Sequence, residues 1–423
     1  PAQVLPFYSQ VFMAKMVVFV QLYFPVFLLG AIFGKLIEMS GAAASLSAAI
    51  VRRLGERHVM LSVVLTCAVL TYGGVSLFVV VFAAYPLAAV MFRQADIPKR
   101  LIPGTIALGS FTFTMDALPG TPQIQNVIPT AFFGTNLYAA PILGCAGAIF
   151  ILTFGMAYLQ WQRHRARDGY GVGHINEPPA LETAERRLHP LLALLPLALL
   201  TATNFGMVRW IAARYGKTFD FASLGLDELG KIEISKTSGI WAIETALCVG
   251  IITTLVIGAA RIRGKVSQGM QSAVSGSLLA AINTASEYGF GGVIACLPGF
   301  VAVKNILATR FAYPLVNEAV SINILAGITG SASGGLSLAL AVMGKQYQAA
   351  AASAGIDPQV LHRVASMASG GMDTLPHNGA VITLLLITGL THRQSYKDIF
   401  AITCLKTAAV FFVIAVFRMT GLY

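Results

Sequence analysis

The sequence predicts an all-α polytopic membrane protein, because apolar residues dominate, charges are few and the apolar segments are long. Hydrophobic residues make up 56% of the 423 residues and charged residues only 11%, whereas a soluble domain carries about a quarter charged residues. Mean hydropathy is +0.73. A helix needs about 20 mostly apolar residues to cross a bilayer, so the chain can supply about ten crossings in one polytopic unit. A water-soluble fold is excluded.

Apolar stretches long enough to form a crossing or a broken crossing recur along the whole chain. They run from about 11 to 33, 59 to 92, 101 to 134, 137 to 159, 188 to 212, 238 to 260, 268 to 302, 312 to 344, 360 to 390 and 399 to 420. The stretches 101–134 and 360–390 carry Pro and Gly in their middle, where proline removes a backbone donor and glycine tolerates an open turn. We interpret both as re-entrant helical hairpins.

An internal repeat is the most informative feature of the chain. The run Met115–Pro119 (MDALP) returns as Met372–Pro376 (MDTLP). Three further matches occur in the same order, at offsets between 257 and 261: Gly73–Leu77 with Gly334–Leu338, Ala95–Pro98 with Ala354–Pro358, and Phe33, Gly34 and Ile37 with Phe290, Gly291 and Ile294. Such order predicts a duplication.

The positive loops place the two Met-Asp runs on opposite sides of the membrane, which predicts two inverted structural repeats, each with a re-entrant helical hairpin and broken transmembrane helices. We expect a first repeat with a charged connecting loop over 1–187, its hairpin at about 101–134. Linking transmembrane helices follow over 188–260. The second repeat covers 261–423, with its hairpin at about 360–390.

The net charge of +11 does not indicate a nucleic-acid partner, because the basic residues stand in short clusters between apolar segments, at 52–57, 163–167 and 261–265. This is typical of cytoplasmic loops, so the expected partner is the lipid bilayer. The five cysteines lie singly, without the spacing of a metal site or a redox pair, and no metal or cofactor is expected.

Two acids lie inside the duplicated turns. An ionised carboxylate in the membrane interior costs several kcal/mol unless it is paired or solvated, so Asp116 and Asp373 are candidates for proton coupling. The structural alternative is that each aspartate caps the second half of its hairpin. His377, expected to be the one histidine deep in an apolar region, is a further candidate for coupling; the alternative is a histidine that only forms structural hydrogen bonds. Glu287, in a stretch that looks broken, is another candidate; the alternative is that it lies near the membrane interface.

Polar side chains close to these turns suit the carboxylate and hydroxyl oxygens of a small solute. Those expected to bind substrate are Thr121, Gln123 and Asn126 after the first acid, and Thr374, Asn378 and Thr383 after the second. Thr383 could equally face a neighbouring helix. Ser331 and Ser333 lie in a run of small residues that forms either a wall of the site or a close contact between helices.

The most specific motifs, GITGSASGGLSL at Gly327–Leu338, GGMDTLPHNGAVIT at Gly370–Thr383 and the following Gly389–His392, resemble the gluconate permease family of bacterial proton symporters. The resemblance extends over essentially the whole chain. It implies a multi-pass protein of the bacterial inner membrane, a homodimer with two inverted repeats, that carries gluconate, related sugar acids or short hydroxy acids such as 3-hydroxybutyrate. Family members have one or two further hydrophobic segments before the position of Pro1, and we expect such segments here.

The resemblance favours proton coupling, because the Ser-Asn-Thr runs of the sodium-coupled branch are absent from both turns. The expected function is therefore proton-coupled symport of a small hydroxy-carboxylate, and not catalysis. A sodium-coupled or exchange-type organic anion transporter is the alternative. An intramembrane aspartyl protease, with Asp116 and Asp373 as a dyad, is a remote one, since the Gly-x-Gly-Asp run of such proteases is missing.

Overall fold

A computed structural model describes residues 3–55, 58–75, 77–166, 168–171, 188–226, 228, 230–264, 266–299, 302 and 311–423. Most of the charged connection that precedes residue 188, including the expected boundary at 187, lies outside these residues. Five of the described helices are long and apolar enough to cross a membrane: Val4–Met39, Pro141–Arg165, Pro190–Tyr215, Lys236–Ile262 and His392–Thr420. The chain is thus a multi-pass membrane protein by the length and hydropathy of its helices.

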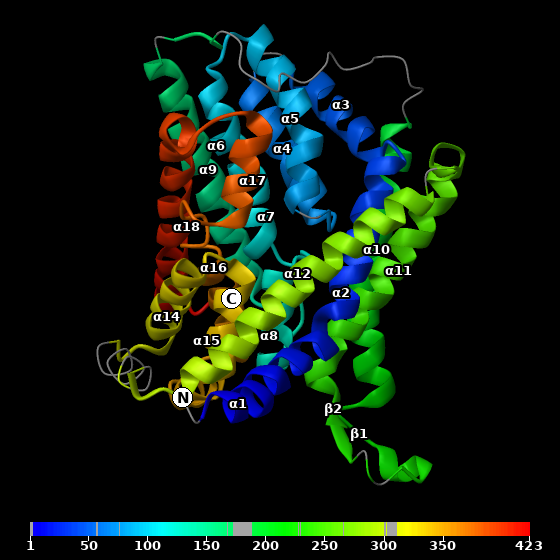
Figure 1. Ribbon diagram of the computed structural model, residues 1–423, viewed down its shortest axis with the longest axis vertical. Coiled ribbons are helices and arrows are strands. Elements are labelled where there is room, and N and C mark those ends of the chain that lie inside the picture. The colour runs from blue at the N-terminus through cyan, green and yellow to red at the C-terminus, as the bar shows by residue number, and fades with distance from the viewer. Residues whose placement is uncertain are drawn as a thin grey trace.

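The first half contains a long N-terminal helix, a series of shorter helices and a second long helix. The elements are α1 (Val4–Phe7), the π-helical turn η1 (Tyr8–Met13), α2 (Ala14–Met39), α3 (Ala42–Leu54), α4 (Val59–Tyr72), α5 (Leu77–Gln94), η3 (Lys99–Leu101), α6 (Ile102–Ser110), α7 (Phe113–Asp116), α8 (Ile124–Phe133) and α9 (Pro141–Arg165). Two linking helices follow, α10 (Pro190–Tyr215) and α11 (Ile234–Ile262). They pack against each other along one side of the molecule, opposite α9 (Figure 1).

The second half repeats the succession of the first. It contains α12 (Val266–Ala295), α14 (Pro314–Thr329), α15 (Ala332–Ser353), α16 (Pro358–Ser369), α17 (Gly379–Thr388) and α18 (His392–Thr420). In each half a long helix precedes two helices joined by a Gly-containing turn, then a segment broken at the Met-Asp run, then a final long helix. The two halves are joined where α2 packs along α12, and α9 packs against α18 (Figure 1).

The helical hairpins do not lie where the sequence placed them. The helices that pack side by side across a tight turn are α4 with α5 and α14 with α15. Among the described residues, α6 has almost no contact with α8, and α16 has almost none with α17. In each case the second helix follows the first along the molecule (Figure 1). The predicted hairpins at 101–134 and 360–390 are therefore broken helices. The physical reason is the turn: the chain reverses within a few residues at Gly73 and Gly330, whereas several non-helical residues carry it onward past each Met-Asp run.

One smaller expectation was also wrong. The stretch around Glu287 is not broken, because α12 runs without interruption from Val266 to Ala295. The predicted helical class is confirmed, and the connection between α10 and α11 adds only a small antiparallel pair of strands, β1 (Thr218–Asp220) and β2 (Lys231–Glu233), with Thr218 opposite Glu233. Lys231 Nζ lies 3.0 Å from Asp220 Oδ2 across this pair.

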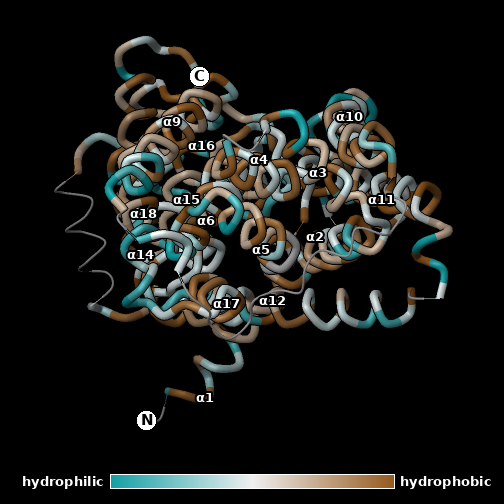
Figure 2. Tube along the Cα trace, turned by 90° about the horizontal axis from the view of Figure 1, so that it is seen from above, coloured by the Kyte–Doolittle hydropathy of each residue, from teal (hydrophilic) through white to brown (hydrophobic). Residues whose placement is uncertain are grey.

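The surface of the long helices is suited to lipid. Figure 2 shows hydrophobic residues on the outward side of these helices as well as inside the molecule. On α10, Leu191 is 71% exposed and Trp210 is 52% exposed. Because apolar side chains are stable against lipid tails and unfavourable in water, these exposed faces indicate contact with the bilayer. Of the shorter broken helices, α6 and α16 lie inside and are buried almost throughout, whereas α17 is partly exposed.

Candidate functional site

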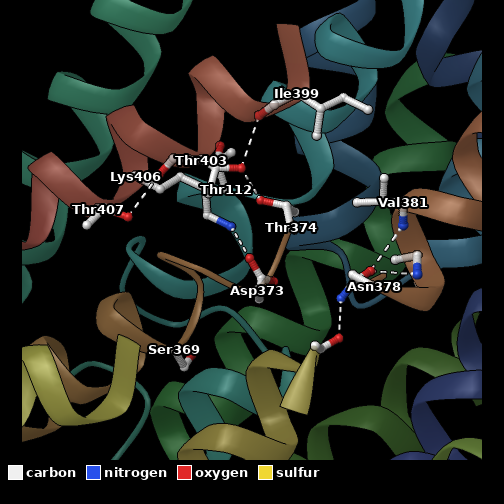
Figure 3. Close-up of polar contacts among 12 residues, drawn as sticks. Thr112, Ser369, Asp373, Thr374, Asn378, Val381, Ile399, Thr403, Lys406 and Thr407 are labelled. Atoms are coloured by element: carbon white, nitrogen blue, oxygen red, sulfur yellow. Dashed lines mark hydrogen bonds and ion pairs between the residues drawn. The ribbon is translucent and has the colours of Figure 1, made fainter. Parts of the chain in front are cut away.

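The break in the second half holds a buried ion pair. α16 ends at Ser369, the chain continues without regular helix, and α17 begins at Gly379. Asp373 lies in this segment, and its Oδ1 accepts a hydrogen bond from Lys406 Nζ of α18 at 2.8 Å (Figure 3). The side chain of Asp373 is 8% exposed and that of Lys406 is 1% exposed. A buried pair of this kind is stable only while both charges are present, so a change in either charge alters the whole site.

The break in the first half brings a second carboxyl group to the same place. Asp116 ends α7 and is fully buried, and its Oδ2 has no hydrogen-bond partner in the described part of the chain. A Cβ added to Gly370 would collide with Asp116 Oδ2 and would lie 3.2 Å from Lys406 Cε. Gly370 therefore marks the point where both breaks and α18 converge, and the absence of a side chain there permits the approach.

Arg363 of α16 joins the two breaks from the inside. Its guanidinium donates to the main-chain oxygens of Asp116 (3.1 Å), Leu137 (3.3 Å) and Ala139 (2.8 and 3.1 Å), and to Asn126 Oδ1 (3.1 Å). A guanidinium has five N–H donors, and these contacts use all of them. Arg363 therefore holds the first break in shape and has no donor left for a solute.

The substrate residues predicted in the first break are engaged with the protein. Asn126 Nδ2 donates to the main-chain oxygens of Thr121 (2.9 Å) and Leu137 (3.0 Å). Thr121 Oγ1 donates to Thr114 O at 2.7 Å. Gln123 Nε2 donates to the main-chain oxygens of Thr71 and Val75, which flank the α4–α5 turn, at 2.7 and 3.3 Å. These side chains fix the break against itself and against the first hairpin.

The second break contacts the second hairpin in the same manner. Asn378 Nδ2 donates to Gly330 O, in the α14–α15 turn, at 2.6 Å, while its Oδ1 accepts from the N–H groups of Ala380 and Val381 and caps α17 (Figure 3). His377 Nε2 lies 3.1 Å from Gly327 O. Gln123 and Asn378 thus occupy corresponding places in the two halves, each joining a break to a hairpin turn.

Glu287 and the two serines meet at the turn of the second hairpin. Ser331 Oγ accepts from Gly334 N at 3.1 Å and caps α15. Ser333 Oγ lies 3.4 Å from Thr284 of α12. The Glu287 carboxyl lies against Gly334, and its Oε2 has no partner in the described residues. Glu287 is therefore brought together with Ser331 and Ser333, as part of the wall that α12 forms against this turn.

Of the remaining predicted residues, Thr374 lies beside the ion pair, Thr383 does not reach the break, and the expectation for His377 was wrong. Thr374 Oγ1 pairs with Thr403 Oγ1 of α18 at 2.5 Å, directly beside Asp373 (Figure 3). Thr383 Oγ1 donates to Gly379 O of its own helix at 2.8 Å and contributes no contact to the break. His377 is exposed, whereas His362 is the fully buried histidine among the described residues, and it lies 3.0 Å from Asn126 Oδ1 and 2.6 Å from Thr135 Oγ1.

Sequence reasoning missed Lys406, Arg363 and His362. A single lysine inside the apolar run 399–420 was a usable signal, because ionisable residues within membrane segments are rare and usually functional. Arg363 likewise stands inside the apolar stretch 360–390. Within the described residues no group of three or more His, Cys, Asp or Glu side chains is arranged to hold a metal ion.

Comparison with known proteins indicates that the chain is a transporter. A GntP family permease profile matches residues 23–167. The "uncharacterized transporter YxjC" of Bacillus subtilis (strain 168) is 56% identical over 432 aligned positions, which cover 100% of this chain and 92% of that protein. The fold resembles two solved transporters at low identity. The Alcanivorax borkumensis YdaH transporter has a TM-score of 0.60 at 15% identity, covering 100% of this chain and 90% of that one.

The second solved structure is Neisseria gonorrhoeae MtrF, described as illuminating a class of antimetabolite efflux pumps. It has a TM-score of 0.59 at 14% identity and covers 95% of this chain and 82% of that one. These likenesses concern the fold, while the close relative and the family profile concern descent. The chain therefore belongs to the GntP family of permeases, which are transporters of the membrane.

Proposed function

We propose that this permease is a proton-coupled symporter of a small hydroxy-carboxylate, such as gluconate or 3-hydroxybutyrate. The observation that carries the proposal is the buried Lys406–Asp373 pair beside Asp116, a second carboxyl with an unpartnered oxygen. The buried ammonium of Lys406, which lies near two carboxyl groups, can leave Asp373 and pair with another anion. That property is needed to bind an organic anion and a proton together.

The charge arithmetic of the site suggests the coupling step. In the resting state Lys406 pairs with Asp373, and Asp116 is best accommodated as the neutral acid, because an unpaired buried carboxylate is costly. Protonation of Asp373 removes its charge and releases the Lys406 ammonium. The carboxylate of the substrate then takes the place of Asp373 beside Lys406. One proton and one anion enter together, so the loaded site keeps the charge of the resting site.

The two-fold arrangement supports alternating exposure of this site. The same succession of elements occurs in both halves, and in each half a break contacts a hairpin turn through an amide side chain, Gln123 or Asn378. We propose that the halves are inverted repeats whose hairpins, α4–α5 and α14–α15, open the site to one side of the membrane at a time. The bacterial origin of the close relative supports a place in the bacterial inner membrane.

The hydroxyl groups nearest to the pair favour a hydroxylated anion. Thr374 lies next to Asp373 and pairs with Thr403 of α18, which is one helical turn from Lys406. A solute whose carboxylate reaches Lys406 would place its own hydroxyl groups against these threonines. His377 and Glu287, at the turn of the second hairpin, are proposed as further groups that exchange protons as that hairpin moves.

Uptake into proteoliposomes tests the proposal. Labelled gluconate and 3-hydroxybutyrate should accumulate when the outside is acidic, and a protonophore should abolish the accumulation. Replacement of sodium by choline should have no effect; a requirement for sodium would establish the alternative coupling. Indifference to the pH gradient, with intact exchange of substrate, would contradict symport with protons.

Two variants assign the coupling to its residues. Asp373→Asn should lose accumulation driven by the gradient, because Lys406 is then permanently unpaired and no proton can bind there. Lys406→Met should lose binding of the anion. Glu244→Gln, which alters a half-buried acid on α11, is the matched control and should transport normally.

A further inference from the structure

Glu318 is a buried acid that the proposed transport step does not use. It lies on α14, is 0% exposed, and neither of its carboxyl oxygens has a hydrogen-bond partner in the described part of the chain. It stands twelve residues before Gly330, so about 18 Å of helix separates it from the α14–α15 turn at 1.5 Å per residue. Glu318 therefore lies away from the hairpin turn, and no described hydrogen bond or ion pair joins it to the Lys406–Asp373 pair.

The described surroundings of Glu318 offer no cation. The helices that pack against α14 are α15, α16 and α18. The buried titratable or charged side chains on these helices are Tyr347 on α15, His362 and Arg363 on α16, and Asp398 and Lys406 on α18. Arg363 uses all five donors elsewhere, and Lys406 pairs with Asp373. An ionised Glu318 would thus be an unpaired buried charge, which costs far more than a neutral carboxylic acid.

We propose that Glu318 is a proton-binding site within the second hairpin, separate from Asp116 and Asp373, and that it carries its proton in the arrangement seen here. The ligand is a proton because one carboxyl group without further acidic neighbours provides too few oxygens for a metal ion.

Nearby hydroxyl groups suit a site that also releases its proton. Ser321 is one helical turn from Glu318 on the same helix, and its Oγ has no partner in the described residues. The buried Tyr347 of α15 lies near both Glu318 and Ser321, and its hydroxyl donates to Met343 Sδ at 3.6 Å, a weak acceptor. Both hydroxyls can turn toward a carboxylate when the proton leaves. The site therefore accommodates both protonation states, with water entry at the hairpin as the step between them.

Carbodiimide labelling tests the site without any transport. Dicyclohexylcarbodiimide adds to protonated carboxyl groups in apolar surroundings. Between Arg310 and Lys345 the sequence contains Glu318 as its only acid, so the tryptic peptide 311–345 reports on this residue alone. We expect this peptide to be labelled in detergent, with less label as the pH rises, and with no effect of sodium at constant pH. Glu318→Gln should abolish the label, and Glu244→Gln should leave it intact.

Infrared spectroscopy provides the second measurement. The wild type should show a carboxylic acid C=O band that Glu318→Gln lacks. Absence of both the label and the band would overturn the proposal, and protection of the peptide by sodium at constant pH would overturn it in favour of a cation site. Asp373 carries the proton in the proposed symport, so Glu318→Gln should keep both substrate exchange and accumulation. The labelling result stands or fails whatever the substrate and its coupling prove to be.

Discussion

Arg363 Nη1 donates to the main-chain oxygen of Asp116 at 3.1 Å, so a guanidinium from the second broken helix holds the backbone of the first at the residue that carries the central acid. The two halves therefore depend on each other for the shape of the site. A solute-binding arginine would leave donors open, whereas this one has none.

Arg363→Met is expected to destabilise the protein by at least about 3 kcal/mol, because it removes five buried hydrogen bonds at about 0.5–1.5 kcal/mol each and leaves Ala139 O without a described donor. The stability of Arg363→Lys should fall between that of the wild type and that of Arg363→Met, since an ammonium has three donors and no planar fork. Arg209→Met on the exposed surface of α10 is the control and should cost little. Denaturation in detergent measures all three. Equal stability of Arg363→Met and wild type would contradict the structural role.

If Lys406 and Asp373 form an ion pair in the membrane, the effects of replacing the two side chains on stability should not be additive. Lys406→Met and Asp373→Asn should each destabilise by about 3–5 kcal/mol, because each leaves a buried charge without its partner. The double variant should cost less than the sum by about 2 kcal/mol or more, since it removes both charges. Additive losses in this double-mutant cycle would show that the two side chains do not form a pair in the membrane.

Sequence patterns located the breaks but could not tell how the segments on either side are arranged. Pro119 and Pro376, with their glycines, correctly indicated where helices end. Whether two successive helices lie side by side or end to end depends on the direction in which the turn releases the chain, and apolar periodicity is the same in both cases. This is why the hairpins were placed at 101–134 and 360–390 instead of at the turns near Gly73 and Gly330.

The partners across the site were beyond local reasoning for a related cause. Asp373 could be identified because a repeated motif marked it, but its cation lies 33 residues away on a helix with no motif. Arg363 reaches Asp116 across 247 residues. Such contacts are decided by tertiary packing, so the sequence predicts that a buried acid needs a partner and does not say which residue provides it.

Gly370 provides a steric test of the convergence between the two breaks. Gly370→Ala should reduce transport at least about tenfold, equivalent to about 1.4 kcal/mol, because the new Cβ would collide with Asp116 Oδ2 next to Lys406. The backbone at Gly370 has φ −81°, which alanine adopts without strain, so the effect would come from the side chain. Gly379→Ala is matched: a Cβ there meets nothing within 4 Å. Equal transport by both variants would mean that the breaks lie further apart.

Asn378 has two roles that substitution can separate. Asn378→Ala should lose both the cap of α17 and the bond to Gly330 O, and the lost cap alone should cost about 1 kcal/mol. Asn378→Asp keeps the acceptor that caps α17 but has no amide to donate to Gly330. It should therefore retain most of the stability and lose transport as fully as Asn378→Ala, provided that the second hairpin must contact the break in the working cycle.

Asp357→Ala is the control for this comparison, because Asp357 caps α16 through the N–H of Gln359 at 2.8 Å and has no described contact with the hairpin turn. It should lose about the same stability as an ordinary cap and keep its transport rate. Melting temperature and initial uptake rate, measured on the same preparations, distinguish the two roles. Transport that follows stability across all three variants would show that Asn378 is only a helix cap, whereas transport lost in the stable Asn378→Asp variant would assign the hairpin contact to the transport cycle.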